Sequence, residues 1–216
     1  MDFFKGSNRY PKKISRQLEN FPKPHKIMDI QNIPYLLNFF KVIYKLKTEK
    51  RRGWIDFDVS LPESISDHQY MMSILTLFIT DPSINKVKCL KMSLVHDMAE
   101  CITTDITPRD GIPKEEKSRM EREAMQTLLG QVNGDGADAS VVRVVEEIVQ
   151  LWEEYESAET AEAKIVKDID KLEMMLQASM YENDQDVDLT QFYQGVKWRN
   201  ESVGRIADEI VEKRNK

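Results

Sequence analysis

The chain has 216 residues and a formal net charge of -6, which makes it long enough for one well-buried core. Charged residues make up 31% and hydrophobic residues 41%, which is typical of a soluble globular protein. The acidic balance argues against a broad nucleic-acid or membrane-binding surface, although a small anionic substrate depends only on local charge. The longest strongly apolar stretch, residues 70–79, is far shorter than the ~20 residues that span a bilayer.

The two cysteines, Cys89 and Cys101, form neither a CxxC pair nor a disulfide framework, which favours a reducing compartment. The first residues are polar and basic, without the apolar region of a secretory signal. These features predict a cytoplasmic protein, with nuclear residence left open.

The order of apolar and polar residues predicts an all-α protein. Residues 1–33, in which prolines stand among lysines and arginines, are expected to form an irregular arm, and residues 34–216 a single helical domain. Pro34 suits the first turn of a helix, and apolar residues repeat at helical spacing from there to Leu46. No alternating strand pattern of useful length and no internal repeat is found.

Two helices are predicted in the next part of the chain, after a loop that ends near residue 62. Candidate N-caps for the first are Ser64, Ser66 and Asp67, and this helix is expected to run to about residue 80. After the break at residues 81–83, a second helix is expected over residues 85–101. Residues 103–113 then form a loop.

Charged and apolar residues at helical spacing fill the remainder of the chain. Helices are expected over residues 114–130, 140–155 and 159–182, with a clear turn at residues 133–136 between the first two. A short helix near residues 189–194 and a terminal helix from about residue 201 complete the prediction.

Three of the predicted helices each carry an unusual polar group on an apolar or buried side. His68 lies in line with Met72 in the apolar stripe of its helix. His96, Asp97 and Glu100 fall within an arc of about 100° when the helix advances about 100° per residue. Imidazole and carboxylate are ligands for a divalent metal of intermediate hardness.

A later helix supplies the third group. Asp170 lies at the flank of the apolar face that Ile169 and Leu172 define, where a carboxylate is costly unless it is paired or bound to a metal. Glu173 lies near the same side and competes for any role given to Asp170. Each group alone has an ordinary interpretation: His68 as a hydrogen-bonded core histidine, the His96 cluster as a solvated face, and Asp170 as a partner of a lysine. The combination across three helices favours a metal site.

Five blocks of sequence resemble one known family in order and spacing. The blocks are Glu63–His68 (ESISDH), Leu94–Glu100 (LVHDMAE), Asp105–Pro108 (DITP), Ile112–Lys117 (IPKEEK) and Val166–Asp170 (VKDID). Together they resemble the HD-domain 5'-deoxynucleotidases, which include the bacterial YfbR enzymes and the eukaryotic HD-domain-containing protein 2 group. The resemblance covers residues 35–182 and the terminal helix, and it implies an HD-domain helical bundle that forms a homodimer.

The resemblance also implies roles for individual residues. The metal ligands would be His68, His96, Asp97 and Asp170, holding one divalent cation, whose identity (Mn, Co, Zn, Fe or Mg) the sequence leaves open. Glu100 would orient or activate the attacking water, and Asp105 would lie beside the scissile phosphate. Trp54 would hold the nucleotide, Arg52 would contact the phosphate with Arg51 as the alternative, and Glu154 would lie near the sugar.

The resulting hypothesis is a metal-dependent 5'-deoxynucleotidase, acting on deoxyribonucleoside 5'-monophosphates. A second hypothesis is another HD-type nucleotide phosphohydrolase or phosphodiesterase. No Gly-Tyr-Pro triplet follows the His-Asp pair, which argues against a cyclic-dinucleotide phosphodiesterase. The chain also lacks the length of the large triphosphohydrolases. A third hypothesis is a metal-stabilised helical binding protein without turnover. The presence of Glu100 and Asp105 argues against it, because a purely structural site needs only the ligands.

Overall fold

The computed structural model describes residues 33–214, so the arm predicted for residues 1–33 lies almost entirely outside the described part. Within residues 33–214 the backbone forms helices and no strand, with one isolated bridge between Lys50 and Ser64, which confirms the all-α prediction. In chain order the helices are α2 (Ile33–Ile43), η1 (Tyr44–Lys47), α3 (Arg52–Ile55), α4 (Ile65–Thr76), α5 (Lys86–Val95), α6 (Glu100–Thr103), η2 (Pro108–Asp110), α7 (Lys114–Val132), α8 (Ala139–Ser157), α9 (Ala161–Asp184), η3 (Thr190–Tyr193) and α10 (Glu201–Arg214).

Helix α4 begins at a capping box. The Oγ of Ser64 accepts the backbone N–H of Asp67 at 3.2 Å, and the Asp67 carboxylate accepts the backbone N–H of Ser64 at 2.8 Å. Each side chain thus satisfies one of the N–H groups that a helix start leaves without an intrahelical partner. Ser64 is therefore the N-cap among the three predicted candidates, and it orients the first turns of α4.

The single helix predicted over residues 85–101 is wrong at its centre. Helix α5 ends at Val95, and α6 begins only at Glu100. The backbone N–H groups of Met98 and Glu100 bond three residues back, to Val95 at 3.0 Å and to Asp97 at 3.1 Å. Such bonds tighten the turn relative to an α-helix, so the projection at about 100° per residue does not apply between His96 and Glu100.

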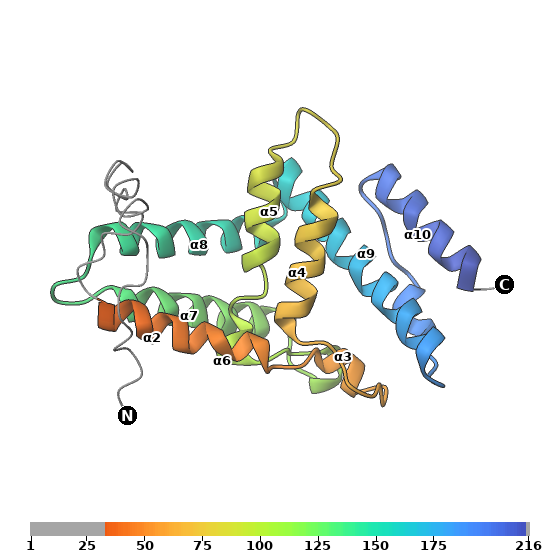
Figure 1. Ribbon diagram of the computed structural model, residues 1–216, viewed down its shortest axis with the longest axis horizontal. Helices are drawn as coiled ribbons and strands as arrows, with labels where there is room; N and C mark the ends of the chain where they lie inside the picture. The colour runs from red at the N-terminus through yellow and green to blue at the C-terminus, as the bar shows by residue number, and fades with distance from the viewer. Residues whose placement is uncertain (1–32, 215–216) are drawn as a thin grey trace, which may run out of the picture. The chain divides into compact units, whose positions relative to one another are not determined.

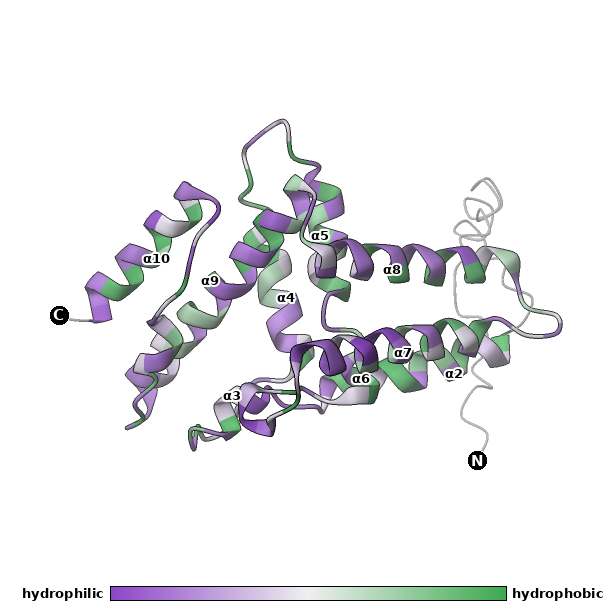
Figure 2. Cartoon of the chain, turned by 180° about the vertical axis from the view of Figure 1, so that it is seen from behind, coloured by the Kyte–Doolittle hydropathy of each residue, from purple (hydrophilic) through white to green (hydrophobic). Residues whose placement is uncertain are grey.

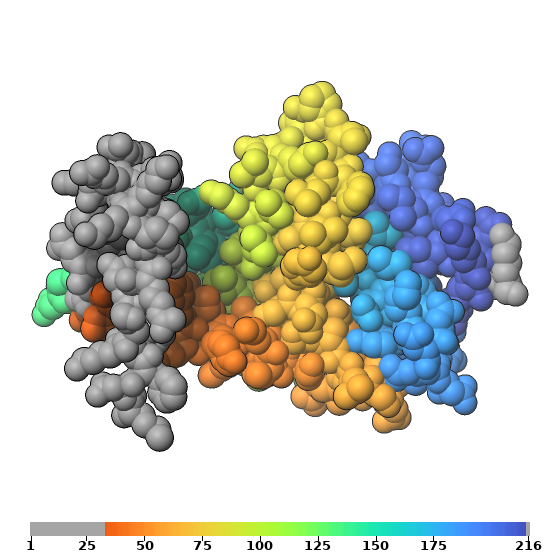
Figure 3. All heavy atoms as spheres, viewed as in Figure 1, coloured from red at the N-terminus to blue at the C-terminus, as the bar shows by residue number. Residues whose placement is uncertain are grey.

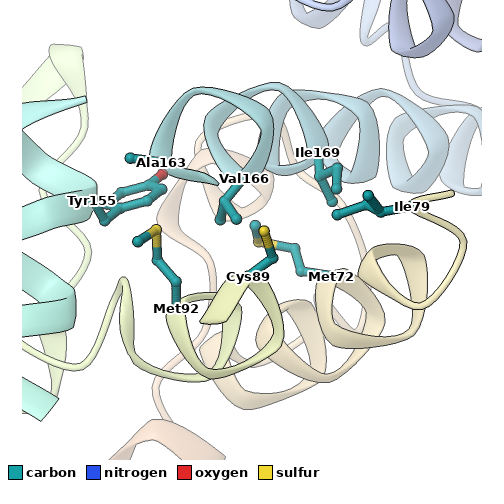
Figure 4. Packing of buried hydrophobic residues seen from close by; sticks show 8 residues of the cluster. All are labelled: Met72, Ile79, Cys89, Met92, Tyr155, Ala163, Val166 and Ile169. Atoms are coloured by element: carbon teal, nitrogen blue, oxygen red, sulfur yellow. The ribbon is translucent and has the colours of Figure 1, made fainter. Parts of the chain in front are cut away.

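The core nearest the polar residues lies between α4, α5, α9 and the end of α8. Its buried members are Met72, Ile79, Cys89, Met92, Tyr155, Ala163, Val166 and Ile169. Figure 4 shows that their side chains point toward one another across the space that separates the helices. The apolar stripe predicted for α4 therefore faces this core, as expected from its 3.6-residue period.

The other helices extend this arrangement in two directions. Helix α7 packs against both α2 and α8, while α10 packs against α9 (Figure 1). Hydrophobic and hydrophilic residues alternate along α7, α8 and α9, as Figure 2 shows. The space-filling view in Figure 3 shows α4 and α5 side by side on one face of the molecule. Among residues 33–214, no helix combines the length and the apolar character that crossing a membrane requires.

Candidate active site

The four predicted metal ligands converge from three parts of the fold. The ligand atoms of His68 on α4, His96 after α5 and Asp170 on α9 all lie within 4.8 Å of one another. Asp97 joins them, because its Oδ2 lies 3.2 Å from the Nε2 of His96 and 3.8 Å from the Nε2 of His68. Two imidazoles and two carboxylates from α4, the turn after α5 and α9 thus lie close together.

The residues at this point suit a divalent cation. The Nε2 atoms of His68 and His96 are both buried, and neither has a hydrogen-bond partner within the described chain. A buried polar atom without a partner is costly, whereas coordination of a cation would satisfy both nitrogens at once. The mixed nitrogen and oxygen set is one that transition metals accept. The donor set therefore fits the predicted metal.

The charged side chains of the site compensate one another. Burial alone would raise the pKa values of Asp97 and Asp170, but the two histidines and Arg51 outweigh burial and hold both pKa values far below their usual range. Burial and Arg51 disfavour a charged His68, yet the nearby carboxylates of Asp170 and Glu173 raise the pKa of His68 to about 9. The arrangement therefore favours a positive charge between the two carboxylates.

Glu100 lies beside this centre, at the start of α6. Its side chain is 4% exposed, and its Oε2 has no hydrogen-bond partner among the described residues. Burial, followed by the charges of Asp97 and Asp105, raises the pKa of Glu100 well above its ordinary value. A carboxylate with a free oxygen next to a metal site can accept a proton or a hydrogen bond from water.

A turn after α6 delivers Asp105 to the same place. Thr104 adopts φ 64°, a conformation that is uncommon for a β-branched residue. Oδ2 of Asp105 then accepts the backbone N–H of Arg52 at 2.8 Å. Asp105 therefore connects the loop after α6 with the start of α3.

Arg51 and Arg52 point in different directions. The Nη1 of Arg51 lies 3.1 Å from the Oδ2 of Asp97, and 17% of its side chain is exposed. The Arg52 side chain is 49% exposed and lies 3.5 Å from Asp56 and 3.8 Å from Asp110. The structure thus brings the alternative, Arg51, to the metal ligands, and it brings only the backbone of Arg52 near the site.

Trp54 and Glu154, the other two residues that the resemblance places at the substrate, lie elsewhere. Trp54 is 2% exposed and donates its indole N–H to Glu63 at 2.9 Å. Glu154 bonds Thr160 and lies 2.5 Å from the Nζ of Lys88, in a separate groove. Neither residue lines the cavity that His96, Asp97 and Asp170 line.

A charged cavity of about 730 Å³ opens from the site toward α7 and α8. From the site itself it is lined by Arg51, His96, Asp97, Glu100, Asp105, Tyr155 and Asp170. From the surrounding helices it is lined by Lys114, Lys117, Ser118, Glu121, Arg122, Glu153, Glu156, Ser157 and Lys167. A cavity of this size suits a ligand as large as a nucleotide.

Three functional side chains carried no assignment in the sequence analysis. Tyr155 donates its hydroxyl to the Oδ2 of Asp170 at 2.6 Å and packs against the ring of His96. Lys117, inside one of the five blocks, bonds the Ile106 carbonyl at 2.9 Å and faces the cavity. The sequence predicts Glu173 only as a competitor of Asp170, whereas the structure places its carboxylate against His68. No spacing in the sequence predicts these contacts, because each contact joins residues of two different helices or loops.

Comparisons with known proteins point to one family. A family model described as "HD domain" matches residues 43–211. The chain is 40% identical over 184 residues to 5'-deoxynucleotidase HDDC2 of Mus musculus, covering 83% of this chain and 88% of the mouse protein. It is 48% identical over 159 residues to 5'-deoxynucleotidase hdd1 of Schizosaccharomyces pombe, covering 73% of this chain and 78% of the yeast protein.

The fold also resembles solved structures. A conserved hypothetical protein from Pyrococcus furiosus matches with a TM-score of 0.62 and 29% identity, over 83% of this chain and 98% of the archaeal chain. The region that the family model matches, residues 43–211, contains α4, α5 and α9, on or beside which the candidate metal ligands lie. The extent of the family match, together with these likenesses, shows that the chain belongs to the HD domain family.

Proposed function

We propose that the chain is a metal-dependent 5'-deoxynucleotidase, which hydrolyses deoxyribonucleoside 5'-monophosphates to deoxynucleoside and phosphate. The observation that carries the proposal is the meeting of two partnerless imidazole nitrogens with two carboxylates beside Glu100, at one end of a nucleotide-sized cavity. The curated relatives named 5'-deoxynucleotidase support the choice of reaction.

The proposed metal ligands are His68, His96, Asp97 and Asp170, with one divalent cation drawn from Mn, Co, Zn, Fe or Mg. Four protein ligands leave positions open in a six-coordinate shell. When bound, such a cation would supply positive charge to the phosphoryl oxygens and make a coordinated water more acidic. The chain itself contributes the orientation of its four ligands.

We assign Glu100 the task of orienting the attacking water. Its Oε2 is free to accept a hydrogen bond, and it lies in the cavity one turn beyond His96. A positioned carboxylate of this kind can hold the proton that the water loses as it attacks phosphorus. Asp105, held by the backbone of Arg52, is proposed to lie beside the phosphate on the same wall.

Arg51 replaces Arg52 as the proposed phosphate contact. A guanidinium group has five N–H donors, and the bond to Asp97 uses one of them. The remaining donors can hold two oxygens of a phosphate in parallel, as arginine commonly does. Lys117, which also lines the cavity, adds a further positive charge there. Trp54 and Glu154 lie outside the cavity, so the base and sugar are left to the cavity residues of α7 and α8.

We also propose three properties of the whole molecule. A cytoplasmic location, with the nucleus left open, is supported by two free, buried cysteines. A homodimer is supported by the family resemblance, and sedimentation of the purified chain would test it.

The domain is taken as residues 34–216, with residues 1–33 as an arm. The family match over residues 43–211 supports this division. Nucleic acid is not proposed as a partner, because the net charge is -6.

Phosphate release from dAMP, dGMP, dCMP and dTMP with added Mn²⁺, Co²⁺ or Mg²⁺ tests the proposal. We expect release from the monophosphates and much less from dATP or a cyclic nucleotide. Preference for the triphosphate or the cyclic nucleotide would favour another HD-type hydrolase. Bound metal without hydrolysis of any of these esters would favour a binding protein and contradict the proposal.

A further inference from the structure

The second nitrogen of His68 has a dedicated partner that lies outside the cavity. Its Nδ1 is 2.5 Å from the Oε2 of Glu173, and the side chains of His68 and Glu173 are 1% and 2% exposed. The two residues come from α4 and α9, which pack against each other. This short contact between two buried groups therefore fixes the orientation of the imidazole ring.

A second layer of contacts holds Glu63 next to this pair. The ligand atoms of Glu63, His68 and Glu173 all lie within 4.8 Å of one another. The indole N–H of Trp54 donates to Oε1 of Glu63 at 2.9 Å, and the backbone N–H of Glu63 donates to the Tyr181 hydroxyl at 2.8 Å. Trp54 on α3 and Tyr181 on α9 thus hold Glu63 in place, and none of these three residues lines the cavity.

This cluster could itself be mistaken for a metal site. Neither Glu63 nor Glu173 lines the cavity, however, and Glu173 is 1% exposed, so a hydrated ion in the cavity does not reach Glu173. The Nδ1 of His68 is also already engaged at 2.5 Å. An imidazole that donates from Nδ1 has its lone pair on Nε2, the atom that faces Asp97 and Asp170.

We propose that Glu173 is a positioning residue that fixes the ring and the proton of His68, so that Nε2 is presented to the cation. The carboxylate makes the imidazole a stronger donor to a metal. Partners of this kind change metal affinity about 10–100-fold when they are removed. The inference rests on the proposed function, specifically on its metal ligands.

Zinc binding to the full chain, measured by calorimetry, tests this role with Glu173→Leu and Glu173→Gln. We expect Glu173→Leu to lose about 10–100-fold in Zn²⁺ affinity, and Glu173→Gln to lose less, because its amide oxygen still accepts a hydrogen bond. A matched control is Asp168→Asn, which removes a buried carboxylate on the same helix whose partners are Lys171 and the backbone of residues 199 and 200. The control should keep the affinity of the wild type.

A spectroscopic readout separates positioning from a general loss of structure. The chain has three histidines, so ¹⁵N labelling of histidine gives few ring signals. In the Zn²⁺-loaded wild type we expect a far-downfield, slowly exchanging Nδ1 proton on His68. Both Glu173 variants should shift or lose it. The Nδ1 proton of His96, which faces the Ser93 carbonyl at 2.9 Å, should stay and serves as the internal reference.

The outcomes are distinguishable. Unchanged Zn²⁺ affinity together with an unchanged His68 ring proton in Glu173→Gln would overturn the positioning role, even if Glu173→Leu fails to fold. Equal losses in Asp168→Asn and the Glu173 variants would also overturn it, in favour of a structural effect. A wild-type chain that binds neither Zn²⁺ nor any other of the five proposed cations would refute the metal ligands themselves, and the role of Glu173 with them.

Discussion

The imidazole rings of His68 and His96 face the same point, but different kinds of contact hold them there. Nδ1 of His96 faces a backbone carbonyl three residues earlier, within its own turn, whereas Nδ1 of His68 faces a carboxylate on another helix. Both arrangements leave Nε2 buried and free. The first depends on local backbone geometry alone, and the second on the packing of α4 against α9. The two ligands should therefore respond differently to changes in tertiary structure.

Glu100→Ala should lower kcat on a deoxynucleoside monophosphate by about 10²–10⁴-fold, because the group that orients the water is lost. Metal affinity should stay near that of the wild type, since Glu100 is not one of the four ligands. Steady-state kinetics and metal calorimetry together measure this. A variant that keeps full activity would show that another group activates the water.

Arg51→Ala and Arg52→Ala form a matched pair of neighbouring arginines. Arg51→Ala should weaken transition-state stabilisation by about 1.5–3 kcal/mol, the usual contribution of a hydrogen bond to a charged group. Arg52→Ala should cost much less, because its backbone N–H still holds Asp105. Values of kcat/KM for the two variants check this. The reverse order would restore Arg52 as the phosphate contact.

Tyr155→Phe should weaken metal binding about 10-fold, because Asp170 loses the hydroxyl that fixes one of its oxygens at 2.6 Å. Tyr193→Phe is the control, since it removes a similar bond to Glu182, away from the site. Calorimetric titration with Mn²⁺ gives both affinities. Equal affinity in wild type and Tyr155→Phe would mean that the cation alone orients Asp170.

At this scale, the convergence of the four proposed ligands could be predicted from the sequence, but the partners of these residues could not. Residue type and order indicate His68, His96, Asp97 and Asp170, because few side chains bind metals and their spacing is characteristic. Glu173 meets His68 across 105 positions of sequence, and nothing local marks that contact. The choice between two adjacent arginines likewise depends on the folded chain, which places Arg51 against Asp97 and Arg52 against Asp56.

At the scale of elements, the break between α5 and α6 is the decisive feature. Hydrophobic periodicity indicates one helix there, because the apolar pattern continues through residues 96–99. The backbone instead tightens after Val95 and restarts at Glu100. His96, Asp97 and Glu100 still line one cavity, although not for the reason that the helical projection suggests. The hydrophobic pattern could locate these residues, but it could not predict the turn between α5 and α6.

The cap of α4 is a second element that serves the site. Ser64→Ala should lower the free energy of unfolding by about 0.5–2 kcal/mol, because the first turn loses its side-chain acceptor. Ser66→Ala, at another predicted cap position in the same turn, should change it far less. Urea unfolding of both variants measures the difference. Equal effects would contradict the assignment of Ser64 as the N-cap.

At the scale of the whole molecule, the cation should also stabilise the fold. Its proposed ligands lie on or beside α4, α5 and α9, so binding ties these helices together. At a metal concentration of 100 times Kd, the gain is about 2.7 kcal/mol. A chain of this size gains about 2–4 °C in Tm per kcal/mol. Chelation should therefore lower Tm of the wild type but leave Asp170→Asn nearly unchanged, as calorimetry would show. Equal shifts in both would place the stabilising metal elsewhere.

The helical class of the molecule could be predicted because composition and periodicity act over many residues. The cavity between the ligand centre and α7 and α8 could not, since its walls come from helices whose relative placement depends on packing.

The most direct test of the account is the structure of Glu100→Ala crystallised with Mn²⁺ and dAMP, with anomalous diffraction to locate the metal. The account predicts one manganese peak bound by Nε2 of His68, Nε2 of His96, Asp97 and Asp170, with the phosphate beside it and near Arg51. A manganese peak at other residues, or a nucleotide whose phosphate lies away from the metal, would contradict it.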